Sequence, residues 1–228
     1  MNDTLSIQVG NNISFVPVLP IGSYDIQATM LGIADYYSIV NSKVAFVPMD
    51  IHDAIKDGKE ALIISLYGCT NIQGQIDLLR IYYNLGVRHI MLCYKNQNNI
   101  GSGCDEHNDS GISVFAGKVI HEIAKLGMVI DLAYAGHRTQ RETLDIIEDI
   151  GVPCIASSEC AARSEESSWQ LKDDIAERIA ASGGVIILRD EANLDHFTKL
   201  LGPEHIVCGD DPANYLRVVD QVWKGKSA

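Results

Sequence analysis

Two hydrophobic periodicities alternate along the chain. Seven short runs are rich in apolar and β-branched residues, as buried parallel strands are. They span residues 13–19, 61–67, 89–94, 128–134, 153–157, 184–188 and 205–209. Segments between them repeat apolar residues with helical spacing, and four of these segments end in Gly86, Gly127, Gly151 and Gly183. Because glycine commonly caps a helix in the left-handed conformation, the pattern predicts strands that alternate with helices.

This alternation predicts right-handed βαβ units and therefore a parallel sheet. The chain has 228 residues, of which 46% are hydrophobic, so it is long enough to bury one sizeable core. We predict an α/β fold, a compact, trimmed (β/α)8-type TIM barrel, as one domain over residues 1–228. Periodicity alone leaves a doubly wound open sheet as the alternative.

The charge balance limits the classes of partner. The formal net charge is −12 at pH 7, which opposes binding to nucleic acid or to an anionic membrane surface. The N-terminal residues lack the pattern of a secretory leader, and no run of apolar residues is long enough to span a bilayer. We therefore expect a soluble, cytoplasmic protein. The six cysteines form neither a dense disulfide framework nor a paired zinc ribbon, so we expect reduced thiols.

Polar and aromatic residues stand where the predicted strands end. In a parallel barrel the C-terminal ends of the strands carry the active site. The residues at these ends are Ser23, Asp25, Tyr67, Tyr94, Tyr134, Ser158, Glu159 and Asp211. A single tyrosine at a strand end is usually a packing residue with its hydroxyl near water. Three tyrosines around one rim are harder to explain by packing alone, so we predict a pocket there.

Several long segments together carry a resemblance to a known family. They are "DLLRIYYNLGVRHIMLCYKNQNNIGSG", "GISVFAGKVIHEIAKLGMVIDLAYAGHRT", "VPCIASSE", "ASGGVIIL" and "LGPEHIVCGDDP". In order and spacing they resemble the membrane (renal) dipeptidase family, a zinc-dependent branch of the amidohydrolase-like TIM barrels. The likeness runs from residue 53 to residue 211. Two stretches are shorter than in the family, so the chain resembles a trimmed member.

The resemblance implies positions for the family's pair of zinc ions, which histidine and carboxylate ligands hold. It places Ser23 and Asp25 at a His-x-Asp motif, Tyr67 at a bridging glutamate, and Tyr134 and Ser158 at two later histidines. Only Asp25 keeps a ligand side chain, and a neutral phenol with a pKa of about 10 is a poor zinc ligand. We therefore expect no metal and no cofactor.

The resemblance also implies which residues meet the substrate. The family's substrate-contacting histidine falls on Tyr94 and its substrate-facing aspartate on Asp211; we group Asn99 and Ser158 with them. The predicted catalytic residues are Asp25, Tyr67, Tyr134 and Glu159. A carboxylate opposite a phenol can perform acid–base work. Because Asp25 and Tyr134 match positions around one metal centre, we expect them to face one another.

These residues favour a metal-independent enzyme that acts on a small amino-acid- or peptide-derived substrate, for example in biosynthetic tailoring. One alternative is an inactive dipeptidase-like binding or assembly protein. Another is a hydrolase with a rebuilt mononuclear metal site formed by Asp25, Glu159, Asp211 and His137, although His137 is more simply interpreted as opening the next helix.

Three further interpretations concern the surface and the thiols. Cys104 and His107 have metal-like spacing, but as a lone pair in a loop they are interpreted as surface residues. Buried cysteines near the strand ends are interpreted as inert packing. A trimmed barrel exposes strand edges that something must cover, so we expect a homo-oligomer, most simply a twofold dimer.

Overall fold

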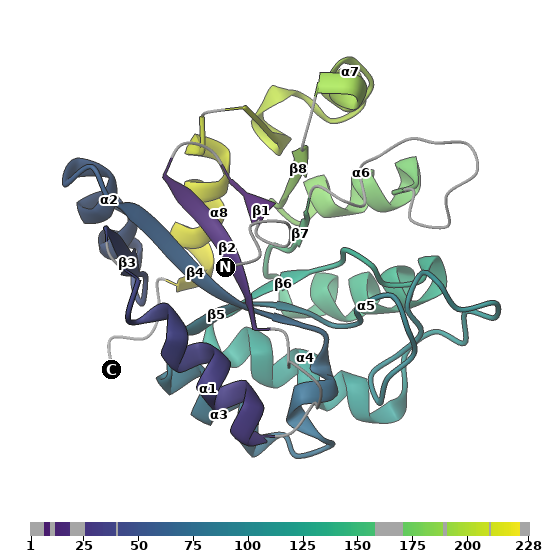
Figure 1. The fold of residues 1–228 in the computed structure, drawn as a ribbon. Helices are drawn as coiled ribbons and strands as arrows, with labels where there is room; N and C mark the ends of the chain where they lie inside the picture. The colour runs from purple at the N-terminus through teal and green to yellow at the C-terminus, as the bar shows by residue number, and fades with distance from the viewer. Residues whose placement is uncertain are drawn as a thin grey trace.

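One curled sheet organises the molecule (Figure 1). The computed structural model describes residues 7–9, 12–18, 26–39, 41–157, 171–188, 191–209 and 211–223. Its strands are β1 (Ile7–Gln8), β2 (Ile13–Val18), β3 (Ser42–Val44), β4 (Glu60–Tyr67), β5 (Val87–Met91), β6 (Val129–Asp131), β7 (Ile155–Ala156), β8 (Val185–Leu188) and β9 (Ile206–Cys208). Each of the seven predicted runs overlaps one of these strands, although β4 and β5 begin one and two residues before their runs. The short strands β1 and β3 were not predicted.

The strands follow the order β1-β2-β4-β5-β6-β7-β8-β9, with β3 beside β4. Strand β1 is antiparallel to β2, and the other pairs are parallel. Among the described strands this path begins at β1 and ends at β9, so the sheet is a half-barrel rather than a closed ring. Strand β5 ends at Met91 and β6 at Asp131, earlier than the apolar runs predicted, so residues 92–94 and 132–134 belong to loops.

Helices surround the sheet. They are α1 (Ile26–Tyr36), α2 (Pro48–Lys56), α3 (Asp77–Asn84), α4 (Val114–Leu126), α5 (His137–Ile150), α6 (Asp173–Ala181), α7 (Leu194–Leu201) and α8 (Ala213–Trp223), with short 3-10 helices at Cys69–Ile72, Glu191–Asn193 and Pro203–His205. Gly127 and Gly151 cap α4 and α5 in the left-handed conformation, as predicted. No helix within the described ranges has the length and apolar character needed to span a bilayer.

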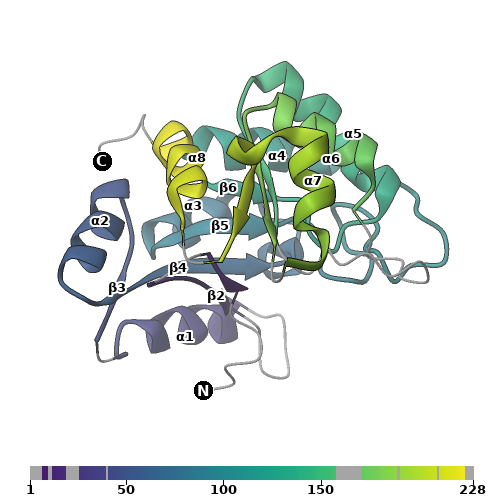
Figure 2. The same ribbon diagram turned by 90° about the horizontal axis from the view of Figure 1, so that it is seen from above.

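The two faces of the sheet are covered differently. Helix α1 lies on the outer face, where a Cβ atom on Gly32 would be 3.2 Å from a methyl group of Val18. Alternation along β2 turns Phe15 to the opposite, inner face. There the ring of Tyr215, from α8, packs edge-on against Phe15 with centroids 5.3 Å apart. Figure 2 shows α1 and α8 on opposite sides of β2 and β4.

Helix α8 also lies at the N-terminal ends of the strands. The Arg217 guanidinium donates to the carbonyls of Gly183 and Glu204, at 3.1 and 2.9 Å, and these residues precede β8 and β9. Helix α8 therefore occupies the N-terminal end of the strands. The loops that follow the strands lie at the opposite, C-terminal end, as they do in a parallel barrel.

Candidate functional site

Three tyrosines meet at the C-terminal ends of β4, β5 and β6. Tyr67 is the last residue of β4, and Tyr94 and Tyr134 follow β5 and β6 in loops. The ring centroids of Tyr67 and Tyr94 are 5.5 Å apart, and those of Tyr94 and Tyr134 are 4.9 Å apart in an edge-on arrangement. Tyr67 and Tyr134 are buried and Tyr94 is partly exposed. The structure therefore brings together the three tyrosines that the sequence singled out.

The loop between β5 and α4 is held tightly against Tyr134. The backbone N–H of Cys104 donates to the Tyr134 carbonyl at 2.9 Å, and the N–H of Asp105 donates to the Lys95 carbonyl, also at 2.9 Å. A Cβ atom on Gly103 would lie 2.0 Å from the Lys95 carbonyl oxygen. This approach requires glycine at position 103, and it places Lys95 beside Tyr134.

Lys95 was not singled out from the sequence, yet its ammonium lies over the tyrosines. Its Nζ atom is 5.6 Å from the ring centroid of Tyr94 and 5.4 Å from that of Tyr134. Both distances are within the range of cation–π attraction. We call Tyr67, Tyr94, Tyr134 and Lys95 the aromatic mouth. The only sequence signal for the lysine was a positive charge directly after a strand-end tyrosine in an acidic chain.

A hydrogen-bonded group of three polar side chains lies on the inner face of the sheet. Ser65 Oγ is 2.6 Å from His89 Nδ1, and His89 Nε2 is 3.0 Å from Asp131 Oδ2. Because a carboxylate only accepts hydrogen bonds, Nε2 donates to Asp131, and in the neutral ring Nδ1 accepts from Ser65. The Phe15 ring stacks on the imidazole with centroids 4.1 Å apart. We call Ser65, His89 and Asp131 the buried network.

The second oxygen of Asp131 fixes two chain segments. Asp131 Oδ1 accepts from the backbone N–H of Ala133 at 2.8 Å and of Ser157 at 3.0 Å. One bond shapes the turn that leads into Tyr134, and the other holds the chain just after β7. Asp131 therefore sets the path of the backbone at two neighbouring strand ends.

The buried network has the residue types of a Ser–His–Asp hydrolase triad. Its three residues are, however, 0% exposed, so no substrate reaches them. The network therefore supports the strand ends from within the sheet. Sequence reasoning missed it, and its only signal was a polar residue at an inward position of each of three apolar runs.

The remaining predicted residues are spread more widely. Asp211 is exposed, and its Oδ1 accepts from the N–H of Ala213 at 2.9 Å, at the start of α8. Asn99 is exposed, and its carbonyl accepts from Ser113 Oγ at 2.6 Å, within the same loop. The other predicted site residues lie outside the described ranges: Ser23, Asp25, Ser158 and Glu159. The expectation that Asp25 faces Tyr134 stays a prediction.

Burial makes the thiols near the site poor nucleophiles. It raises the pKa of Cys93 and of Cys104 to about 12 and that of Cys69 well above its usual value. Their description as inert packing agrees with these shifts. The expectation that Cys104 lies on the surface is wrong, because the loop that packs against Tyr134 buries it. His107 is exposed, as predicted.

The described residues do not fit a binuclear zinc centre. Two of the matched ligand positions hold Tyr67 and Tyr134, whose neutral phenols are weak ligands for zinc. No group of three or more His, Cys, Asp or Glu residues suited to a metal ion occurs within the described ranges. His137 opens α5, as predicted, and its Nε2 atom is 3.4 Å from Asp174 Oδ1 on α6.

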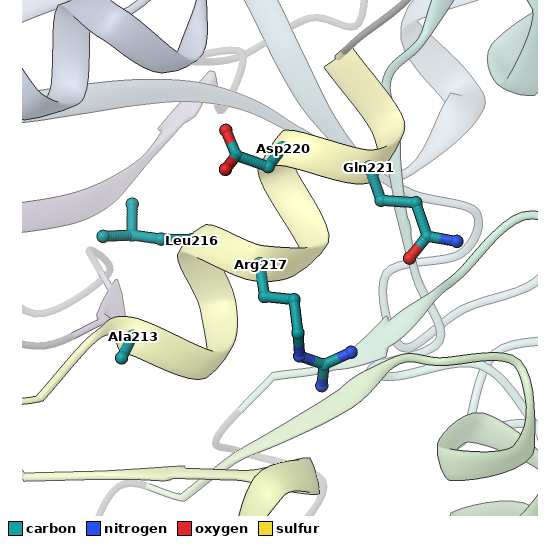
Figure 3. Close-up of a pocket in the computed structure, with 5 residues that line it drawn as sticks. All are labelled: Ala213, Leu216, Arg217, Asp220 and Gln221. Atoms are coloured by element: carbon teal, nitrogen blue, oxygen red, sulfur yellow. The ribbon is translucent and has the colours of Figure 1, made fainter.

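A separate pocket lies on α8. Figure 3 shows its lining residues, which are Ala213, Leu216, Arg217, Asp220 and Gln221. Its arginine is engaged with the two carbonyls that precede β8 and β9. This pocket is therefore at the N-terminal end of the strands, opposite the aromatic mouth, and we do not assign the site to it.

The half-barrel has a TIM-barrel type of fold that it shares with solved hydrolase structures. An amidohydrolase from Pseudomonas aeruginosa superposes with a TM-score of 0.77 at 16% identity, over 93% of this chain and 89% of that one. A metallopeptidase from Rhodobacter sphaeroides, liganded with a phosphinate mimic of the dipeptide L-Ala-D-Ala, gives 0.74 at 16% identity, over 92% and 77%. The predicted barrel class is therefore confirmed.

The sequence comparison identifies the family. Residues 14–222 match the membrane dipeptidase family (peptidase family M19), so the chain belongs to it, and the predicted resemblance is confirmed. An uncharacterized dipeptidase of Schizosaccharomyces pombe is 29% identical over 177 residues, which cover 68% of this chain and 42% of the relative. The chain spans less than half the length of the curated relatives it matches.

Proposed function

We propose that this chain is a hydrolase-like enzyme whose dipeptidase pocket has been rebuilt to act without zinc on a small amino-acid- or peptide-derived compound. One observation carries the proposal. At the strand ends where the family resemblance expects metal ligands, the chain has Tyr67 and Tyr134, and Tyr94 joins their rings into one cluster. Erosion of an unused site would be expected to leave small, unrelated side chains, whereas this cluster is well packed.

The chemistry that we propose uses the chain's own groups. A carboxylate, Asp25 or Glu159, takes a proton from the substrate or from water. Tyrosine hydroxyls stabilise the negative charge that develops on the substrate, as oxyanion-hole donors do. Asp211 holds a substrate amine. The bound dipeptide mimic in the Rhodobacter sphaeroides structure supports a peptide-like compound as the substrate class.

Three related predictions belong to this proposal. The chain forms one domain and functions in the cytoplasm. It assembles as a twofold dimer, because the edges of the half-barrel are otherwise exposed. Light scattering at micromolar concentration tests the dimer, and a monomer alone would contradict it.

Metal analysis tests the proposed loss of zinc. We expect the purified, dialysed protein to hold far less than one zinc ion per chain and to leave ordinary dipeptides uncleaved, with or without added zinc. About two retained zinc ions per chain would contradict the proposal. A mononuclear zinc content with dipeptide cleavage would favour the rebuilt-site alternative instead.

A matched pair of variants sharpens this test. Tyr67→Glu combined with Tyr134→His returns two ligand types to the matched positions, so zinc uptake should rise above that of the parent. Tyr36→Glu combined with Tyr37→His makes the same changes at the last residue of α1 and the residue after it, and should leave zinc uptake unchanged. Equal uptake by the two double variants would contradict the assignment of Tyr67 and Tyr134 to the former metal site.

A further inference from the structure

Part of the loop between β5 and α4 lies against the start of α5 (Figure 1). We call this part, residues 102–111, the strap. Its two ends meet, because Gly101 and Ile112 pair in an antiparallel bridge. Next to this bridge, the Ser113 N–H donates to the Ile100 carbonyl at 2.7 Å. The strap is therefore a compact surface loop with adjacent ends, a form of loop that is frequently functional.

Asp109 of the strap caps α5 from outside the helix. The N-cap residue of α5 is Gly136, which has no side chain to accept the first N–H groups of the helix. The Asp109 carboxylate accepts from the N–H of Arg138, and from the N–H and hydroxyl of Thr139 at 3.4 and 3.0 Å. A Cβ atom on Gly136 would lie 2.5 Å from Asp109 Oδ2, so glycine leaves room for this carboxylate.

A second contact runs the other way, from α5 to the strap. Glu142 of α5 accepts from the N–H of Ile112 at 2.8 Å. A Cβ atom on Gly111, which has φ 76°, would lie 2.2 Å from Glu142 Oε2. Each carboxylate therefore occupies the space that a glycine leaves on the other element. We call the contacts of Asp109 and Glu142 the latch.

The strap covers the chain that follows β6. The Cys104 N–H donates to the Tyr134 carbonyl at 2.9 Å, and the Gly136 N–H donates to the Ser102 carbonyl, also at 2.9 Å. The side chain of Tyr134 is buried, at 1% exposed. A solute that is to meet this side chain therefore requires a covering segment to move.

Hydrogen bonds, rather than apolar contacts, hold the strap in place. Its only buried apolar side chain is that of Cys104, and Asp105, His107, Asn108 and Ser110 are exposed. Segments with few buried apolar contacts open at a lower free energy than the core, and lids over ligand sites are drawn from such segments. Release of the latch would therefore open the strap while the sheet stays folded.

We propose that the strap is a lid at the C-terminal end of β6, closed by the latch, and that it opens locally to admit the substrate to Tyr134. This inference rests on the proposed function and names the segment that controls access to its site. The competing assignment is a loop that leaves α5 only when the whole protein unfolds. The sparse apolar packing of the strap favours the lid.

Thiol labelling of the full chain tests the lid without measuring turnover. Cys104 in the strap is 6% exposed, and Cys154, just before β7, is 0% exposed and reports on the core. Burial raises the pKa of both thiols to about 12, so the two are matched in acidity. The rate of reaction with N-ethylmaleimide is followed for each thiol by peptide mass spectrometry at increasing urea concentrations below the unfolding transition. Each rate is normalised to that of the same thiol in the unfolded chain.

Two variants weaken the latch and a third is the matched control. Asp109→Ala removes the carboxylate of the strap, and Glu142→Ala removes that of α5. Asp174→Ala is the control, because Asp174 pairs with Arg141 of α5 from α6 rather than from the strap. Circular dichroism checks that each variant is folded.

In the parent, Cys104 should react more than about tenfold faster than Cys154, because local opening is more frequent than global unfolding. Its rate should depend only weakly on urea, since opening the strap exposes little surface. Asp109→Ala and Glu142→Ala should each raise the Cys104 rate about tenfold to hundredfold, as expected when hydrogen bonds to a charged group are lost. Asp174→Ala should raise it less than about fivefold, because an exposed ion pair contributes little.

Equal rates and equal urea dependence for the two thiols in the parent would overturn the lid, because the strap would then open only with global unfolding. An unchanged Cys104 rate in both latch variants, or an equal increase in Asp174→Ala, would overturn the assignment of the latch. If Asp109→Ala does not fold, the parent and Glu142→Ala still decide both points.

The outcome is separable from that of the proposed function. A zinc-containing or inactive protein would contradict the proposed function and still report whether the strap opens locally. An active, zinc-free enzyme whose strap opens only with global unfolding would contradict this inference alone.

Discussion

The buried network and the aromatic mouth are adjacent layers of one half-barrel, and they are built in opposite ways. The network consists of strand residues that are fully buried and joined by hydrogen bonds. Lys95 and Tyr134 in the mouth lie on loops with positive φ, and the layer is held by ring contacts. The difference teaches that regular strands supply the rigid support, whereas the loops that follow them carry the positive-φ backbone of Lys95 and Tyr134.

Removing the carboxylate of Asp131 should disrupt the buried network. Asp131→Ala leaves His89 and the N–H groups of Ala133 and Ser157 without their acceptor. Breaking such a buried pair lowers the free energy of unfolding by about 3–5 kcal/mol. Urea denaturation measures the change. Asp145→Ala is the control, because Asp145 pairs with Arg178 on the surface and should change stability by less than about 1 kcal/mol. Equal effects would mean that the network does not support the fold.

Removing one hydroxyl from the aromatic mouth should lower turnover without unfolding the protein. Under the proposed function, Tyr134→Phe lowers turnover by roughly 10²–10³, as the loss of one oxyanion donor does. Asp25→Asn removes a proposed base and lowers turnover by roughly 10²–10⁴. The assay uses the substrate found by metabolite profiling. Tyr37→Phe is the control, because the Tyr37 hydroxyl donates to the Leu85 carbonyl away from the strand ends. Unchanged turnover in both site variants would favour the binding or assembly alternative.

Relieving the backbone strain at Lys95, which has φ 66°, gives a third comparison between the aromatic mouth and the buried network. Lys95→Gly and Lys95→Met both remove the ammonium, but glycine adopts positive φ without a steric penalty. We expect Lys95→Gly to have a free energy of unfolding about 1 kcal/mol higher than Lys95→Met. Thermal or urea unfolding compares the two variants directly. If the free energy of unfolding of Lys95→Met equalled that of Lys95→Gly, the backbone at Lys95 would not be strained.

The smallest expected effect is a change in the free energy of unfolding at alkaline pH, caused by the phenol of Tyr215, whose ring packs against Phe15. Burial raises the pKa of Tyr215 well above its usual value. The unfolded chain loses this proton near pH 10, while the native protein keeps it, so stability is complete below about pH 10 and falls as the pH rises further. Tyr215→Phe should make that fall shallower in urea titrations between pH 9 and about pH 11. An identical pH dependence in parent and variant would contradict this assignment.

Local patterns in the sequence predicted much of the scaffold. The apolar runs located the long strands, and Gly127 and Gly151 located two helix ends, because these features depend on neighbouring residues. The strand-end argument also selected Tyr67, Tyr94 and Tyr134, which the structure brings together. Adjacent parallel strands end at the same edge of a sheet, so strand order alone makes these residues neighbours.

Features that depend on strand register or on loop packing were not predicted from the sequence. The hydrogen bonds among Ser65, His89 and Asp131 require three strands in one register, which no local pattern specifies. The position of Lys95 depends on the close approach of Gly103, eight positions further along the same loop. Burial of Cys104 follows from the same loop. Helices α1, α2 and α7 were not predicted.

The contact between Phe15 and Tyr215 has a consequence for biosynthesis. The two rings pack together although about 200 positions separate them in the sequence. A ribosome adds roughly 5–20 residues per second, so the nascent chain would wait on the order of 10–40 s before α8 can cover Phe15. Throughout that interval, the inner side of β2 presents an apolar surface to the cell. Heat-shock chaperones that bind exposed aromatic segments should therefore associate with chains stalled before residue 213.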